Sequence, residues 1–483
     1  MKKNQLFNFE YSYFSLPDKF YSLVKPGLFP KPEIFLLNKE LCHQLNLSIE
    51  SKEDLLAAFM GEGYQKNSRF FAQAYAGHQF GHFTKLGDGR AIIIGEHLTE
   101  NKQRFDIQLK GSGRTPYSRG GDGKATLKAM LREYLISEAI HYLNIPSSRS
   151  LGLIKTGEPV YRETIEEGAI LARVMQSHIR VGTFEYASYF GSVDNLKALT
   201  SYTINRLYPE IEKGENPVLD FLNKVMINQI ELVVNWMRVG FIHGVMNTDN
   251  TSIACETFDY GPCAFINTYH PDTVYSSIDH NGRYAFGNQP KIIKWNISRF
   301  AEALLSIIHH DKEKSLQLAQ ATIDQFDEIW KMKYYGMMLN KIGIDNNDES
   351  LYLLVDELLD CMKNLNMDYT NTFWSLSHDN IPEDSLINGS DFKPWLKKWQ
   401  DYIDMSSGMK QAKHMMKKHN PAIIPRNHLV EQALEEMVNG NPNLFKRLLS
   451  IISMPYQYQD GLDEFMKPPE SKFESNYQTY CGT

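Results

Sequence analysis

The character of this chain changes near residue 195, and that change constrains the fold more than any other feature. Before it, short apolar and β-branched segments alternate with glycine-rich loops, a pattern that predicts strands and tight turns. After it, apolar residues recur at i, i+3, i+4 and i+7 through most of the remaining sequence, which predicts amphipathic helices. The sequence therefore indicates an α+β protein with a strand-rich lobe, a helix-rich lobe and a cleft between them.

Several segments of the strand-rich part have clear boundaries. RFDIQLK at 104–110 alternates apolar and polar residues and is predicted as a strand, and a glycine-rich loop follows at 111–123. The next stretch, 124–143, has the apolar period of an amphipathic helix. Turn glycines in KLGDGRAIIIGE, at the end of the segment 69–94, indicate a β-hairpin. Further strands are predicted at 149–155, 159–165 and 168–175.

The helix-rich part gives long predicted helices at 194–208, 217–241 and 297–310, and through most of 315–453. We divide the chain into four predicted parts. They are an extended N-terminal arm that packs on the core (1–68), a strand-rich lobe (69–190), a helical lobe core (191–300) and a helical C-terminal extension (301–483).

Composition excludes several classes of protein. A net charge of −7 argues against a nucleic-acid-binding protein, and no stretch approaches the 18 uninterrupted apolar residues of a membrane span. The five cysteines are widely scattered, so neither a disulfide framework nor a zinc site is indicated. The N-terminal residues contain no apolar run typical of a secretory signal. We expect a monomeric cytoplasmic enzyme.

The stretch HGVMNTDN at 243–250, followed by Asp259-Tyr260-Gly261, has the spacing of a kinase catalytic loop and its metal-binding tripeptide. In that pattern the third residue is an aspartate that accepts the substrate proton, but here it is Val245. Asn250 and Asp259 occupy the metal-binding positions, and their oxygens suit Mg²⁺ or Mn²⁺. Asp249 is available as a replacement base, although structural loop acids are an alternative interpretation.

Other candidate residues lie before this loop. Gly87, Gly89 and Arg90 in LGDGR could cover a phosphate, or form an ordinary hairpin turn. Lys110 ends a predicted strand where a kinase-like fold places its phosphate-contacting lysine, and the alternative is a surface lysine. Its acidic partner would come from the predicted helix 124–143, which carries Glu133 near its middle and also Glu138.

Two further pairs of residues are ambiguous. Asp122, followed by Gly123, could cap the helix that begins at 124 or bind a nucleotide. Arg173 and Arg180 could clamp a polyphosphate, and on a helix their spacing would place them on one face. Two arginines at this spacing are more commonly just solvated.

These motifs occur in the order of a protein-kinase fold, and their particular forms resemble the selenoprotein O family. The resemblance covers nearly the whole chain, and the stretches that carry it are YAGHQFG (75–81), LGDGR (86–90), QLKGSGRTPYSRGGDG (108–123), HGVMNTDN (243–250), DYGP (259–262) and DHNGRYAFGNQP (279–290). The resemblance implies a kinase-like two-lobe fold that transfers AMP from ATP to Ser, Thr or Tyr hydroxyls of proteins. UMP transfer from UTP with Mn²⁺ is also implied for bacterial members.

The resemblance also implies roles for individual residues. Lys110 would pair with Glu133, Asp249 would accept the proton, and Asn250 and Asp259 would hold Mg²⁺ or Mn²⁺. The nucleotide would be bound in a flipped orientation, with its β- and γ-phosphates deep in an arginine-rich small lobe. Its site would comprise Gly87, Gly89, Arg90, Lys110, Asp122, Gly123, Arg173, Arg180 and Asp259.

Cys481, third from the C-terminus, stands where eukaryotic members of the family carry selenocysteine. The resemblance implies a redox-sensitive tail, although the loop after Asp259-Tyr260-Gly261 lacks the expected partner cysteine. Cys255 and Cys263 are the nearest alternative partners in the sequence, and a free tail thiol is the other interpretation. Three hypotheses for function stay open: a protein nucleotidyltransferase, an inert ATP-binding pseudokinase scaffold and an unconventional phosphotransferase.

Overall fold

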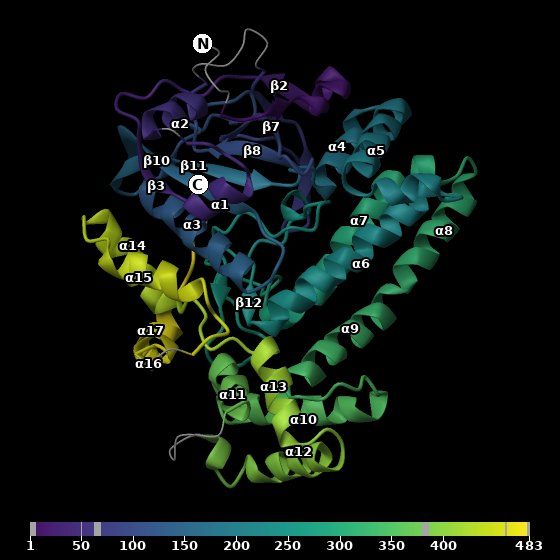
Figure 1. Cartoon of the computed structure of the whole chain (residues 1–483). Coiled ribbons are helices and arrows are strands. Elements are labelled where there is room, and N and C mark those ends of the chain that lie inside the picture. Colours follow the sequence, from purple (N-terminus) through teal and green to yellow (C-terminus); the bar gives the residue numbers. More distant parts are fainter. Residues whose placement is uncertain (1–5, 50, 62–68, 379–385, 459–460, 481–483) are drawn as a thin grey trace.

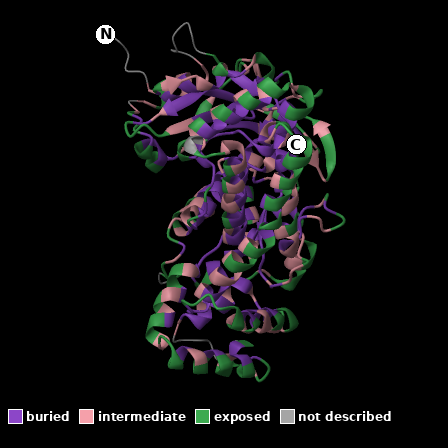
Figure 2. Ribbon diagram, turned by 90° about the vertical axis from the view of Figure 1, so that its right-hand side faces the viewer, coloured by how far each residue is buried: buried purple, intermediate pink, exposed green. Residues whose placement is uncertain are grey.

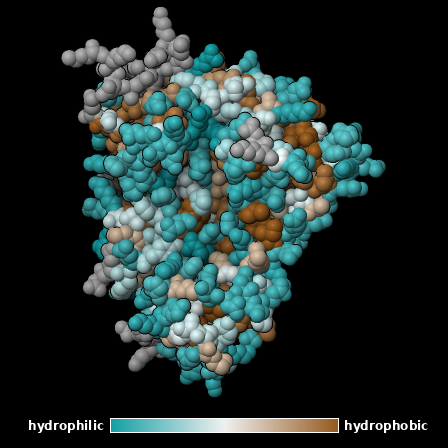
Figure 3. Space-filling model, turned by 45° about the vertical axis from the view of Figure 1, so that its right-hand side comes forward, coloured by the Kyte–Doolittle hydropathy of each residue, from teal (hydrophilic) through white to brown (hydrophobic). Residues whose placement is uncertain are grey.

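The computed structural model of the chain describes residues 6–49, 51–61, 69–378, 386–458 and 461–480. A strand-rich lobe lies at the top in Figure 1, and most of the helices lie below and beside it. The face shown in Figure 3 is mostly hydrophilic and has a few hydrophobic patches. Within the described residues, no helix is both long and apolar enough to span a membrane.

Among the described residues, nine strands form one antiparallel sheet in the order β2-β4-β7-β8-β11-β10-β3, with β1 paired to β7 and β9 paired to β11. Their bounds are β1 Phe9–Glu10, β2 Tyr21–Leu23, β3 Glu33–Leu37, β4 Phe71–Gln73, β7 Ala91–Leu98, β8 Arg104–Lys110, β9 Ala125–Thr126, β10 Arg149–Tyr161 and β11 Ile165–Met175. The N-terminal residues expected to form an arm thus supply β1, β2 and β3, which include both edge strands.

The predicted strand at 104–110 is confirmed as β8 with the same bounds. The strands predicted at 149–155 and 159–165 overlap a single irregular strand, β10, which pairs with β11. The hairpin prediction for LGDGR is wrong. The nearby hairpin is β5 (Ala76–Gln79) with β6 (His82–Lys85), and LGDGR is the loop that connects it to β7.

The helix predicted at 124–143 is confirmed as α3 (Leu127–Tyr142), but it begins three residues later. Residues 125–126 form β9 against β11, and the Thr126 side chain then accepts a hydrogen bond from the backbone N–H of Ala129. The prediction that Asp122 caps this helix is therefore wrong. Thr126 instead accepts from one of the backbone N–H groups that have no partner within the first turn of α3.

The change to helices near residue 195 is confirmed. The helices of the lower lobe and the extension are α4 Val181–Phe190, α5 Val193–Leu207, α6 Pro217–Arg238, α7 Gln289–Ile308, α8 Lys312–Asp324, α9 Phe326–Lys341, α10 Tyr352–Asn364, α11 Tyr369–Leu376, α12 Lys393–Met405, α13 Met409–His419, α14 Asn427–Val438, α15 Asn443–Ile452, α16 Asp463–Met466 and α17 Ser471–Asn476. Two short helices, α1 (Lys39–Gln44) and α2 (Lys52–Phe59), belong to the upper lobe. Residues along the inner faces of these helices are buried (Figure 2). The four-part division of the chain stays a prediction.

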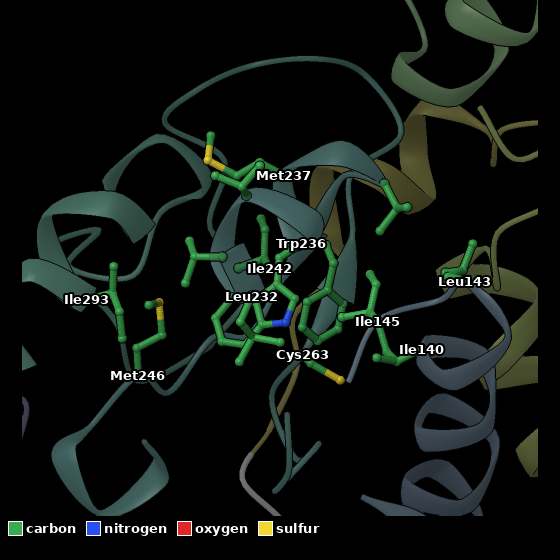
Figure 4. Close-up of a cluster of buried hydrophobic side chains, with 14 of the residues drawn as sticks. Ile140, Leu143, Ile145, Leu232, Trp236, Met237, Ile242, Met246, Cys263 and Ile293 are labelled. Atoms are coloured by element: carbon green, nitrogen blue, oxygen red, sulfur yellow. The ribbon is translucent and has the colours of Figure 1, made fainter. Parts of the chain in front are cut away.

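A buried hydrophobic cluster contains residues of both lobes and Met246 of the loop 243–250. Figure 4 shows side chains of α3 and the turn after it meeting side chains of α6 and the loop that follows it; among them are Ile140, Leu143, Ile145, Trp236, Met237, Ile242 and Met246. The chain leaves α6 at Gly240, whose φ of 75° is a left-handed conformation that favours glycine. A short strand, β12 (Phe241–Ile242), paired with β13 (Ala264–Phe265), then leads into the loop.

Candidate active site

A cleft of about 430 Å³ lies between the sheet and the helical lobe. Its wall brings together the residues of LGDGR, the loop 111–123, β8, β11 and both halves of the motif at 243–261. Seven lysines and arginines line it against four aspartates, so the cleft attracts anions although the whole chain carries a net charge of −7. The seven cations are Arg90, Lys110, Arg119, Lys124, Arg162, Arg173 and Arg180.

A buried ion-pair network forms the inner wall of the cleft. Lys110 Nζ at the end of β8 lies 2.6 Å from Glu133 Oε2 on α3 and 2.6 Å from Asp259 Oδ1. Arg173 on β11 lies 3.3 Å from Glu133 Oε1 and 3.0 Å from Asp259 Oδ1. The partner of Lys110 is thus Glu133, whereas Glu138 pairs with Arg149. A strand lysine bound to a helix glutamate beside this aspartate is the arrangement of the kinase fold.

The surrounding cations control the charge of Asp259. Burial alone would raise the pKa of this carboxyl, but Lys110, Arg173 and Arg180 hold its pKa well below the ordinary value. The carboxylate is therefore ionised at any physiological pH. Oδ1 accepts from Lys110 and Arg173, and the side chain keeps a quarter of its surface exposed to the cleft.

Arg173 and Arg180 do not share a helix face, and neither is solvated. Arg173 lies on β11, Arg180 immediately precedes α4, and each is 3% exposed. Arg180 donates to the backbone oxygen of Asp249 over 3.2 Å and stacks on the ring of Tyr75 at 4.1 Å. Their burial could not be inferred from their spacing, because it depends on strand pairing and on loops that are distant in sequence.

Asp249 and Asn250 lie in the one-turn 3-10 helix Thr248–Asn250. The Asp249 carboxyl is buried at the cleft wall, where Oδ2 accepts from Gln79 over 3.3 Å and Oδ1 has no hydrogen-bond partner. Burial is the largest cause that raises the pKa of Asp249, to about 6, while Arg180 opposes it. Gly77 permits this packing, because a Cβ there would lie 2.8 Å from Asp249 Oδ1.

A second set of residues holds this turn, and sequence reasoning gave them no role. Glu185 on α4 accepts from Thr248 Oγ1 through one carboxylate oxygen and contacts His78 Nδ1 through the other, each over 2.5 Å. The backbone N–H of His78 also donates to Thr248 Oγ1 over 2.7 Å. His78 and Gln79 belong to the stretch YAGHQFG, so the resemblance marked their segment without indicating what the side chains contact.

Two loops that line the cleft have positions that only glycine fits, Gly87 and Gly123. Gly87 has a φ of 146° and packs so closely on Tyr117 that a Cβ would lie 2.3 Å from the ring. Gly123 has a φ of 70°, and a Cβ there would meet the Gly113 oxygen at 2.1 Å. These loops also bring Gly89, Arg90 and Asp122 to the cleft wall.

Asp122 binds Arg162, a residue that sequence reasoning did not select. Arg162 Nη1 lies 2.8 Å from Asp122 Oδ2, and this bond lowers the pKa of the Asp122 carboxyl. Arg162 follows the long strand β10, where nothing in the sequence distinguishes it from a solvated arginine. Only the fold shows that it reaches the cleft.

The prediction of a redox-sensitive tail concerns Cys481 and its possible partners, Cys255 and Cys263. Cys481 lies outside the described residues. Cys255 and Cys263 are buried free thiols, and burial raises the pKa of each to about 12, which makes both weak nucleophiles at neutral pH. The redox-sensitive tail therefore stays a prediction.

The donor set near Asp259 fits a divalent cation. Asn250 Nδ2 donates to the Val245 oxygen over 3.1 Å, which fixes the side-chain amide beside the cleft. No cluster of three or more histidine, cysteine or acidic side chains suited to a metal occurs in the described part of the chain. One amide and one carboxylate, completed by phosphate oxygens and water, are instead typical of Mg²⁺ at a nucleotide site.

The comparisons with known proteins agree with this geometry. The model of the family described as protein adenylyltransferase SelO matches residues 4–453. This chain belongs to that family. A relative from Pelagibacter ubique (strain HTCC1062) named protein nucleotidyltransferase YdiU is 48% identical over 480 residues, covering 99% of each chain. A relative of the same name from Bacillus cereus (strain B4264) is 49% identical over 480 residues, and the match covers 99% of this chain and 98% of that protein.

Two solved structures from Toxoplasma gondii have weaker similarity, at 10% sequence identity. The first is a specific rhoptry antigen kinase domain. Its match covers 61% of this chain and 88% of the kinase-domain chain, with a TM-score of 0.24. The second is ROP2, described as a virulence factor with a protein-kinase fold and no enzymatic activity. Its match covers 69% of this chain and 87% of the ROP2 chain, with a TM-score of 0.22. The α+β class predicted for this SelO family member is confirmed by its nine-stranded sheet and its helical region, and the Lys110–Glu133 pair beside Asp259 is the local arrangement that the kinase fold uses.

Proposed function

We propose that this chain transfers AMP from ATP to Ser, Thr or Tyr hydroxyls of proteins and releases pyrophosphate. The observation that carries the proposal is the buried Asp249 carboxyl in the cleft wall, one of whose oxygens has no hydrogen-bond partner. Val245 stands at the kinase base position and cannot accept a proton, whereas Asp249 Oδ1 is buried at the cleft wall without a partner. Membership of the SelO family and the names of the relatives support the same reaction.

The chemistry requires one bond to form and one to break. The acceptor oxygen bonds to the α-phosphorus of ATP, and the bond from that phosphorus to the oxygen that bridges the α- and β-phosphates breaks. Asp249 takes the hydroxyl proton, and pyrophosphate leaves with the electron pair of the broken bond. A pKa of about 6 keeps Asp249 mostly ionised at neutral pH and more basic than an ordinary aspartate, which suits a general base.

The inner cations suit the leaving group. Lys110, Arg173 and Arg180 are buried deep in the wall, where their charge is little screened by water. In our proposal they bind the β- and γ-phosphates and stabilise the charge that develops on pyrophosphate. Asn250 and Asp259 would hold Mg²⁺ or Mn²⁺, which supplies further neutralisation of phosphate charge.

An inert scaffold is the weaker alternative. The described residues retain the Lys110–Glu133 pair, an ionised Asp259 and a buried Asp249, and the family is one of adenylyltransferases. UTP as a second donor, with UMP transfer, is part of the proposal. Intact-mass spectrometry of an acceptor protein tests these options directly, because added AMP, UMP and phosphate differ in mass and a scaffold adds nothing.

Lys110→Met should reduce transfer about 10²–10³-fold, the usual effect of removing one preorganised donor from a developing charge. Methionine keeps the length of the side chain but cannot bridge Glu133 and Asp259, which both lie 2.6 Å from Lys110 Nζ. Because Arg173 still contacts both carboxylates, we expect the free energy of unfolding to fall by only about 1–3 kcal/mol. Initial rates and urea unfolding curves measure the two effects.

Lys155→Met is the matched control. Lys155 lies on β10, which β11 separates from β8 in the sheet, and it pairs with Glu167 at 2.9 Å, away from the cleft-lining residues. This variant should transfer AMP at the wild-type rate. A Lys110→Met protein that is fully active, or one that is inactive only because it is unfolded, would exclude the proposed role.

A further inference from the structure

A second hollow, of about 600 Å³, adjoins the catalytic cleft. Phe80 and Ile278 line both, so the two spaces are adjacent. We call this hollow the acceptor groove and define it by Phe80, His82, Ile278, Arg283 and Lys291. Its walls come from the turn of the β5–β6 hairpin, the loop 278–283 and the start of α7.

The groove is directly connected to the catalytic turn. Asn247, two residues before Asp249, accepts at Oδ1 from the backbone N–H of Phe80 over 3.0 Å and from the Tyr284 hydroxyl over 2.5 Å. Phe80 has a φ of 49°, a left-handed conformation that is unusual for a residue with a side chain. Phe80 thus joins the groove to the loop that carries Asp249, and both residues line the catalytic cleft.

Arg283 presents an ordered cation to this groove. Its guanidinium stacks on Trp295 of α7 at 4.9 Å, and it lies beneath the turn at Gly81, where a Cβ would be 3.8 Å from it. Within the described part of the chain, no carboxylate lies within ion-pair distance of Arg283. The nearest acid in sequence, Asp279, instead accepts from the backbone N–H groups of Arg283 and Tyr284.

Lys291 adds a second cation. It is exposed in the first turn of α7, a 20-residue helix with no acidic residue in that turn. A positive side chain there is disfavoured by the helix dipole, which favours an anion instead. No ion pair joins Lys291 to a carboxylate among the described residues. A carboxylate bound between Arg283 and Lys291 would supply the missing ion-pair partner of both cations, and it would offset the unfavourable position of Lys291 at the helix N-terminus.

We propose that the acceptor groove binds the protein substrate and selects hydroxyl residues flanked by aspartate or glutamate. This inference rests on the proposed function, since it concerns the polypeptide that receives AMP. The charge of the groove argues for it. Among the described residues, Arg283 and Lys291 form no ion pair, and the acid beside them, Asp279, accepts from backbone N–H groups. In a chain of net charge −7, such a groove gives acidic segments a specific place to bind.

Synthetic peptides test the proposal. Each carries one Ser, Thr or Tyr, flanked by glutamates in one set, by alanines in a second and by lysines in a third. Transfer from ATP labelled on the α-phosphorus gives kcat/KM for each, with self-labelling of the enzyme measured in the same tube. We expect the glutamate peptides to be used about tenfold better than the alanine peptides, the combined effect of two partly exposed ion pairs.

Charge reversal provides the decisive variant. Arg283→Glu with Lys291→Glu should invert the order, so that lysine peptides become the best acceptors, while the Kd for ATP stays at the wild-type value. Arg299→Glu is the matched control: Arg299 stacks on the same Trp295 at 5.5 Å but pairs with Glu302 at 2.6 Å. This variant should keep the wild-type preference for glutamate peptides. A general loss of packing cannot invert a preference.

The possible failures are distinguishable. The groove assignment is overturned if peptides are labelled without any preference for acidic flanks. It is also overturned if the preference is unchanged in the charge-reversed variant. Both results leave the proposed function standing. No label from the α position on either peptide or enzyme overturns the proposed function, and the groove assignment with it.

Discussion

Asp259→Asn is expected to abolish metal-dependent binding of ATP and to slow AMP transfer about 10³-fold or more. The change removes the charge that would hold the cation, whose stabilisation of phosphate charge is worth several kcal/mol. Asparagine retains the shape and tolerates the φ of 62° at this position, so the loop should keep its conformation. ATP binding titrated with and without Mg²⁺ or Mn²⁺, together with transfer rates, gives both quantities.

The control for this variant is Asp272→Asn. Asp272 is an exposed acid in the loop that follows, with a side chain 83% exposed, and it should have no effect on either measurement. Wild-type turnover in Asp259→Asn, or ATP binding with an unchanged metal requirement, contradicts the assignment of Asp259 to the cation.

Asp249→Asn should slow transfer about 10²–10⁴-fold, the usual contribution of a general base. The Kd for ATP should change much less, because proton transfer contributes mainly in the transition state. Single-turnover rates at saturating ATP, with binding measured separately, distinguish the two effects. If binding and rate fall in proportion, Asp249 acts in structure or in metal binding. A rate within a few-fold of wild type removes Asp249 from the mechanism.

The pH profile gives an independent test of the same residue. A base must be ionised, so wild-type activity should rise with pH through the pKa of Asp249 and then level off. Burial raises that pKa to about 6, and a cation bound at Asn250 and Asp259 would lower it, so the rise is expected at or below about pH 6. The Asp249→Asn variant should lose this rise. An identical rise in the variant assigns it to another group.

Most of the fold could be predicted from the sequence because its elements are long and periodic. β8 and α3 were indicated by apolar spacing alone, and β8 has the predicted bounds. The failures were local. LGDGR was predicted as a hairpin turn because glycine marks any tight turn, and only strand pairing shows that β6 and β7 belong to different sheets.

The site was predicted less completely. The motif at 243–259 indicated Asp249, Asn250 and Asp259, and these residues do line one cleft. By contrast, the contact between Asp122 and Arg162 joins segments 40 residues apart, and that between Glu185 and Thr248 joins segments 63 residues apart. No spacing rule predicts such pairs, because they depend on how strands and helices pack in three dimensions.

The most direct test of the account is to incubate the protein with an acceptor and ATP labelled on either the α- or the γ-phosphorus. We predict that label from the α position is incorporated into protein and that label from the γ position is released as pyrophosphate. Heat-inactivated enzyme and the Asp259→Asn variant should incorporate neither. Incorporation from the γ position alone would show a phosphotransferase, and incorporation from neither by the active-site-intact protein would show a scaffold. Either result would contradict nucleotidyl transfer.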